Sequence, residues 1–170
     1  MRKKIIIIII IAIVAIALGI TAHHFVAHRS DQTAQEWLDK QSEYVNNLTV
    51  YTDQMDDVFT LYFTGAISAE DFYVHLQTLY AEVDIMETDY QTYKESHPIV
   101  IGSQTYKTKL GTEAIGKCYG LLKEMLDKCA IDYDAPDLVL YEYLNYHQLI
   151  IEQLADYIVS QNMSTTPAYG

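Results

Sequence analysis

Two cysteines are the side chains in this sequence that could support redox chemistry or bind a metal through sulfur. Cys118 and Cys129 are eleven residues apart. On one continuous helix this spacing separates the two residues by about 16 Å along the axis, whereas a disulfide requires Cα atoms within about 7 Å of each other. The sequence therefore predicts two buried thiols that pack as small apolar side chains, without a Cys-x-x-Cys redox or metal motif.

His147 is the second candidate for chemistry, because it lies on an apolar helical face close to Tyr143. Two interpretations stay open for this pair. In the first, His147 sits at the edge of a core and bonds to a tyrosine or a carboxylate. In the second, His147 and Tyr143 line a pocket for a small polar molecule. A di-iron carboxylate bundle would require two Glu-x-x-His pairs, which the sequence lacks.

The acidic residues of the sequence do not match a known catalytic or metal-binding pattern. Asp132, Asp134 and Asp137 lack the glycine and the final glutamate of a calcium-binding EF-hand loop. The sequence also has no nucleophile elbow, phosphate-binding loop, zinc motif or dinucleotide-binding fingerprint. We therefore expect no cofactor, no metal ion and no enzymatic activity.

The N-terminal segment contains the elements of a membrane anchor. Residues 2–4 are basic, and residues 5–27 contain no Asp, Glu, Lys or Arg. A membrane-spanning helix needs about 20 apolar residues, and the apolar core of a secretory signal is shorter. We expect a retained signal-anchor helix over residues 5–27 in contact with the lipid bilayer. The alternative is a secreted protein, cleaved near Gly19 or Ala22.

Charge decides the expected orientation and the expected partners. The basic residues of positions 1–4 outnumber Arg29 on the other side of the apolar run, so the positive-inside rule places the N-terminus in the cytoplasm. From residue 31 onward there are seven lysines and all 23 acidic residues, a formal charge of −16 (7 − 23). This acidic body, expected outside the cytoplasm, would repel nucleic acids.

Beyond residue 30 the apolar residues follow a helical period. Steps of four and three residues predict a first helix over residues 31–63, with Gly65 at its C-terminal cap. Ser68 is the expected N-cap of a second helix, which Pro98 ends. The two seams consist of Trp37, Gln41, Tyr44, Leu48, Tyr51, Met55, Val58 and Tyr62, and of Phe72, Leu76, Leu79, Val83, Met86, Tyr90 and Tyr93.

Two further helices are expected after residue 103. The third covers residues 104–130, and Gly111, Gly116 and Gly120 predict that it is the weakest, since each glycine costs about 1 kcal/mol relative to alanine. The fourth follows Asp134 as N-cap, with Pro136 in its first turn. Its expected apolar residues are Leu140, Tyr143, Leu144, His147, Ile150, Ile151, Leu154, Tyr157 and Ile158.

Four long helices joined by short turns predict an all-α fold. We expect an N-terminal transmembrane helix followed by an antiparallel, up-down four-helix bundle over residues 31–161 and a flexible tail over residues 162–170. Because an even number of antiparallel helices returns the chain to its starting end, the C-terminus should lie near the membrane side.

Five of the 15 tyrosines and two of the glycines supply a candidate surface for binding another protein. The aromatic residues of this surface are Tyr73, Tyr80, Tyr106, Tyr141 and Tyr146, and the small residues are Gly116 and Gly120. Asn47 and Asn162 begin glycosylation sequons, which matter only in a source that glycosylates proteins.

Together these features favour a tethered binding domain over an enzyme. We expect a single-pass, non-enzymatic scaffold or interaction module of a cell envelope, whose partner is another envelope or membrane protein. The alternative function is a ligand-sensing bundle that works with a separate signalling protein.

Overall fold

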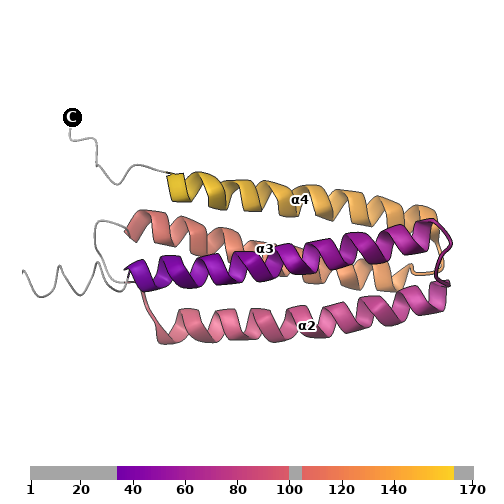
Figure 1. Cartoon of the computed structure of the whole chain (residues 1–170), viewed down its shortest axis with the longest axis horizontal. Helices are drawn as coiled ribbons and strands as arrows, with labels where there is room; N and C mark the ends of the chain where they lie inside the picture. Colours follow the sequence, from indigo (N-terminus) through magenta and orange to yellow (C-terminus); the bar gives the residue numbers. More distant parts are fainter. Residues whose placement is uncertain (1–33, 100–104, 163–170) are drawn as a thin grey trace, which may run out of the picture.

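The computed structural model describes residues 34–99 and 105–162, and within these residues the chain is all-helical, with four helices and no strand. Successive helices run in opposite directions and lie side by side as a bundle (Figure 1). The helices are a first helix over residues 34–63, α2 (Ala69–Ser96), α3 (Thr105–Ile131) and α4 (Pro136–Asn162).

The predicted anchor at residues 5–27 lies outside the described residues. Among the residues that are described, no helix is both long enough and apolar enough to cross a membrane.

The turn between the first helix and α2 has the predicted caps. Gly65 adopts a φ of +70°, a conformation that glycine tolerates without steric strain. The Gly65 and Ala66 amides donate to the carbonyls of Tyr62 and Leu61, at 3.0 and 2.8 Å. At the start of α2, Ser68 Oγ accepts a hydrogen bond from the Asp71 amide at 3.1 Å. Both helix ends are therefore fixed by local backbone chemistry.

The start of α4 differs from the prediction by one residue. The helix begins at Pro136, and the carbonyl of Ala135 accepts the amides of Leu138 and Val139, both at 3.0 Å. Ala135 therefore occupies the cap position, and the prediction of Asp134 as N-cap is wrong. Pro136 is at the first helical position, where its missing N–H costs no hydrogen bond.

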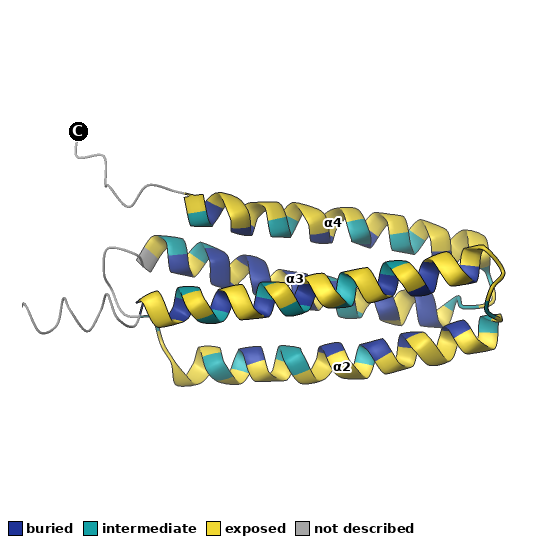
Figure 2. Cartoon of the chain, viewed as in Figure 1, coloured by how far each residue is buried: buried dark blue, intermediate teal, exposed yellow. Residues whose placement is uncertain are grey.

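The four helices surround one continuous core, which Figure 2 shows as buried stripes on the inward faces. The largest side chains in it are fully buried and are mostly the residues of the predicted seams. They are Trp37, Tyr44, Tyr90, Tyr119, Phe59, Phe72, Leu48, Met55, Leu76, Ile115, Leu122 and Met125.

α3 packs closely against neighbouring side chains at two of its glycines. α3 contacts both α2 and α4, while α2 and α4 lie across the bundle from each other. A Cβ at Gly116 would lie 3.3 Å from the Tyr90 ring, and one at Gly111 would lie 2.6 Å from Gln41 Oε1. Two of its three glycines therefore permit close approach of a neighbouring side chain.

The buried face of α4 is narrower than its apolar surface. Its buried residues are Val139, Tyr146, Ile150, Tyr157 and Ser160. The expected core residues Leu140, Leu144, Ile151 and Ile158 are exposed. A helix with apolar side chains on more than one face cannot bury all of them against a bundle that covers only one side.

The first helix begins, and α4 ends, at the same end of the bundle. Figure 1 shows the start of the first helix and the end of α4 on the same side. Gln161 Nε2 near the end of α4 donates to Gln41 Oε1 in the first helix at 3.3 Å. The prediction that the chain returns to its starting end is confirmed for the described residues.

We expect Leu76→Ala to lower the free energy of unfolding by about 2–5 kcal/mol, because Leu76 is fully buried in the core. Val74→Ala is the matched control on the same helix, since Val74 is 61% exposed and should change stability by less than about 0.5 kcal/mol. Chemical denaturation followed by helical circular dichroism measures both. Equal effects of the two substitutions would contradict the assigned inward face of α2.

Candidate functional site

A buried polar layer crosses the bundle near the end where the first helix begins. Gln41 is fully buried, and its Nε2 donates to the Thr108 carbonyl at 2.7 Å and to Thr112 Oγ1 at 2.8 Å. The Tyr90 hydroxyl donates to the Thr112 carbonyl. This layer explains why a polar residue interrupts the apolar seam of the first helix, and its role is to hold helices in register.

Two carboxylates at the edge of the core accept hydrogen bonds from core tyrosines. Tyr44 Oη donates to Asp89 Oδ2 at 2.8 Å, and Tyr143 Oη donates to Asp56 Oδ1 at 2.8 Å. Burial, followed by the hydrogen bond to a carboxylate, raises the pKa of both tyrosines above the ordinary range. These hydroxyls therefore remain protonated and connect neighbouring helices.

The side chains of the candidate pocket, His147 and Tyr143, both contact residues of the first helix. The Tyr143 ring stacks on Phe59 of the first helix with 4.2 Å between ring centroids. His147 Nε2 lies 3.5 Å from the same Asp56 oxygen that Tyr143 bonds. Both side chains are half-buried. The arrangement matches the first interpretation of His147, a residue at the edge of the core beside a carboxylate.

The two cysteines are free and buried. Cys118 Sγ donates to the Ile150 carbonyl and Cys129 Sγ to the Val139 carbonyl, at 3.9 and 3.8 Å. Burial raises the pKa of each thiol to about 12. Because the thiolate is the nucleophilic form, neither cysteine is suited to catalysis near neutral pH.

The structure does not bring the predicted tyrosine surface together. Tyr146 is buried, and its hydrogen bond to Glu124, with burial as the second cause, raises its pKa to about 12. Its assignment to an exposed binding surface is therefore wrong. Tyr141 is exposed on α4, whereas Tyr73 and Tyr80 belong to α2 across the bundle.

The other members of that surface have separate environments. Tyr80 lies under the Lys123 ammonium, which is 5.5 Å from the ring centroid and pairs with Asp84 and Glu87 at 2.6 and 2.8 Å. Tyr106 is exposed near the start of α3. The two glycines differ from each other: Gly116 is half-buried against Tyr90, while Gly120 is exposed with open space around it.

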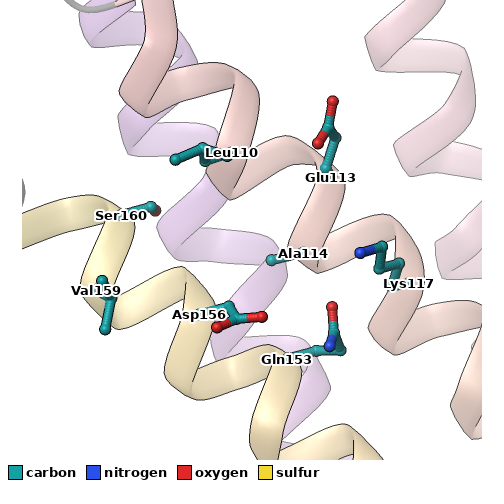
Figure 3. A pocket seen from close by; sticks show the side chains of 8 residues that line it. All are labelled: Leu110, Glu113, Ala114, Lys117, Gln153, Asp156, Val159 and Ser160. Carbon is teal, nitrogen blue, oxygen red and sulfur yellow. The ribbon is translucent and has the colours of Figure 1, made fainter.

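A pocket of about 270 Å³ opens between α3 and α4 near the end of α4. Figure 3 shows Lys117 and Asp156 turned toward the gap between the two helices, while the Glu113 carboxylate points away from it. The two carboxylates therefore do not converge as an acid and base pair would. The pocket is lined by Leu110, Glu113, Ala114, Lys117, Gln153, Asp156, Val159 and Ser160.

The most extensive unusual surface is the outward face of α4, which Figure 2 shows as exposed along nearly the whole helix. Its exposed fractions reach 66% at Tyr141, 56% at Leu144, 45% at Ile151 and 58% at Ile158. We call this row the outer seam, and it consists of Tyr141, Leu144, Gln148, Ile151, Ala155 and Ile158, all of them exposed. An exposed row made mostly of apolar side chains is a candidate interaction surface.

Sequence reasoning named only Tyr141 among these residues as a surface candidate. It placed Leu144, Ile151 and Ile158 in the core because their spacing fits a buried stripe. The signal that could have found the outer seam is an excess of apolar positions, since α4 carries more of them than one buried stripe can hold.

Within the described residues, no group of three or more His, Cys, Asp and Glu side chains is arranged to hold a metal ion. Comparisons with protein-family models, with curated proteins and with solved structures find no match to this chain. The surfaces of the bundle are therefore the basis for a functional proposal.

We expect Gly111→Ala and Gly120→Ala to change stability in opposite directions. Alanine at position 120 meets open space and should stabilise α3 by about 1 kcal/mol through helix propensity. Alanine at position 111 would displace the Gln41 amide from its bonds to Thr108 and Thr112 and should cost about 1–3 kcal/mol. Chemical denaturation measures both, and stabilisation by Gly111→Ala would show that the polar layer does not fix the helices.

Proposed function

We propose that this chain is a single-pass, membrane-tethered helical module that binds another protein on the outer side of the membrane and has no enzymatic activity. The observation that carries the proposal is the outer seam of α4, an exposed apolar row on a helix whose opposite face is buried in the core. Burial of such a row against a partner would remove it from water, which is the main driving force of protein association.

The sequence supports the tether, and the fold is compatible with it. The apolar run of residues 5–27 follows three basic residues, and the described part of the first helix starts only a few residues later. The start of this helix and the end of α4 share one end of the bundle (Figure 1). A tether at that end would leave the outer seam accessible along the side of the bundle.

The tether is tested by membrane extraction of the full-length chain. We expect it to remain in the membrane pellet after a carbonate wash and after high salt, because an apolar helix in the bilayer is not held by charge. N-terminal sequencing of the pelleted protein should begin at or near Met1. Release by either wash would overturn the anchor, and a new N-terminus after Gly19 or Ala22 would identify a secreted protein instead.

The outward orientation is tested by labelling one introduced cysteine. Ile85 is exposed on α2, so Ile85→Cys should react in intact cells with a thiol reagent that does not cross membranes. The parent chain is the control, because both of its cysteines are buried. Labelling that requires broken cells would place the bundle on the cytoplasmic side and contradict the proposed orientation.

The pocket between α3 and α4 favours a second candidate function, the sensing of a small ligand. Its opening presents an ammonium group from Lys117 and a carboxylate from Asp156 (Figure 3), a pair complementary to a zwitterion such as a free amino acid. The volume of about 270 Å³ lies near the lower end of small-molecule sites.

We expect free amino acids, tested one at a time, to raise the thermal midpoint of the chain if this pocket is a sensor site, because a ligand that binds only the folded state stabilises it. Asp156→Asn should abolish the shift, since it removes the charge that would hold the ligand ammonium. Asp53→Asn, an exposed acid on the first helix, should leave it unchanged. No shift with any amino acid would remove this candidate.

A further inference from the structure

We propose that the outer seam of α4 binds the outer seam of a second copy of this chain, with the two helices parallel and in register. The inference rests on the proposed function, because it names the partner of the α4 surface on which that function depends.

The outer seam has the spacing of a coiled-coil contact. Its six residues follow one another in steps of three, four, three, four and three, which is the alternation that keeps one row facing a partner helix. From Tyr141 to Ile158 the row extends for about 26 Å. Asp137, in the first turn of α4, ends it with a charge.

The seam is suited to its own copy because the positions beside it are nearly uncharged. These flanking positions in the heptad are Leu140, Asn145, His147, Glu152, Leu154 and Val159, among which only Glu152 is an acid. A second copy therefore meets little like charge at the contact, although the body as a whole is acidic. A basic partner helix would find only one carboxylate beside the seam to pair with its cations.

The single flanking acid favours the parallel arrangement. In a parallel pair, a flanking position just before a seam residue lies opposite the flanking position five residues further along the other helix. His147 precedes Gln148 in the seam, so Glu152 lies opposite His147 of the partner subunit. An antiparallel pair centred on Ile151 would bring the two Glu152 side chains close together, which is unfavourable. His147 already lies beside Asp56, on the edge of α4 next to the first helix.

Gln148 fixes how the two α4 helices align along their length. It is the one amide within the seam, and its Nε2 now donates to Glu152 Oε1 at 3.0 Å. In a parallel, in-register pair the two Gln148 amides lie opposite each other and can bond across the interface. A single polar residue at such a position specifies the alignment and the two-stranded state of coiled coils.

The area of the seam fits a contact between tethered copies. A pair of helices over this length buries on the order of 1,000 Å² in total, at the threshold of a specific interface. Confinement to one membrane raises the effective concentration of the two copies and orients their bundles alike. Both effects favour a parallel contact that would be weak between free proteins in solution.

The partner is identified by photo-crosslinking of the full-length chain in its own membrane. A photoreactive amino acid at position 144, within the seam, should give an adduct of twice the mass of the chain. The same amino acid at position 85, exposed on the outer face of α2, should give none. An adduct of another mass at position 144 would show that the partner is a different protein, which would overturn the proposed self-association but support the proposed interaction module. The absence of any adduct would overturn both proposals.

The direction of the helices is tested by disulfide formation under mild oxidation. Leu144→Cys and Ile158→Cys should each form a covalent dimer when expressed alone, because equivalent residues in a parallel pair are close enough for a disulfide. Cross-linking only when the two variants are mixed would show an antiparallel pair and overturn this arrangement. The parent chain controls for the buried native cysteines.

A charge introduced in the middle of the outer seam should disrupt the contact between the two copies, and the same charge elsewhere on the surface serves as the control. Ile151→Glu should reduce the Leu144→Cys dimer at least tenfold, whereas Ile85→Glu, at another exposed isoleucine, should leave it unchanged. Helical circular dichroism of both variants shows that the monomer remains folded. An undiminished dimer in Ile151→Glu would mean that the outer seam is not the contact.

Discussion

The bundle depends on one constraint, which is that tyrosine hydroxyls on its buried seams need acceptors on a neighbouring helix or turn. Tyr44 and Tyr143 are bonded to carboxylates of other helices, and Tyr62 donates to the Tyr133 carbonyl at 2.8 Å. A buried hydroxyl without a partner would cost about 1–3 kcal/mol. Each such bond therefore selects one neighbour and one register, and the amide of Gln41 does the same in the polar layer between the first helix and α3.

The same constraint explains how an acidic chain builds an aromatic core. Asp56 and Asp89 each accept a hydrogen bond from a tyrosine at the edge of the core. Lys123 holds two further acids of α2 against α3. Part of the negative charge is thus used between helices, and the remainder stays on outward faces, where it keeps these faces in water.

α4 differs from this scheme because its apolar surface exceeds what the bundle can cover. Its inward face is fixed by Tyr146, Ile150 and Tyr157, which pack into the core. The outward row that includes Leu144 and Ile151 then has no neighbour within the described chain. A fold of four helices buries only one face of each, so an apolar second face is the part of the structure that most directly suggests association with another protein.

Local chemistry in the sequence determined the helices and most of their ends. The Gly65 turn, the Ser68 cap and the stop before Pro98 depend on residues close together in the chain, and they were predicted for that reason. The period of apolar residues likewise predicted the inward faces of the first helix and α2. Only the tertiary structure decided which face of α4 is covered and that Tyr146, not Leu144, is buried. A helical period gives the angle of a side chain around its own axis, whereas burial depends on where the neighbouring helices lie.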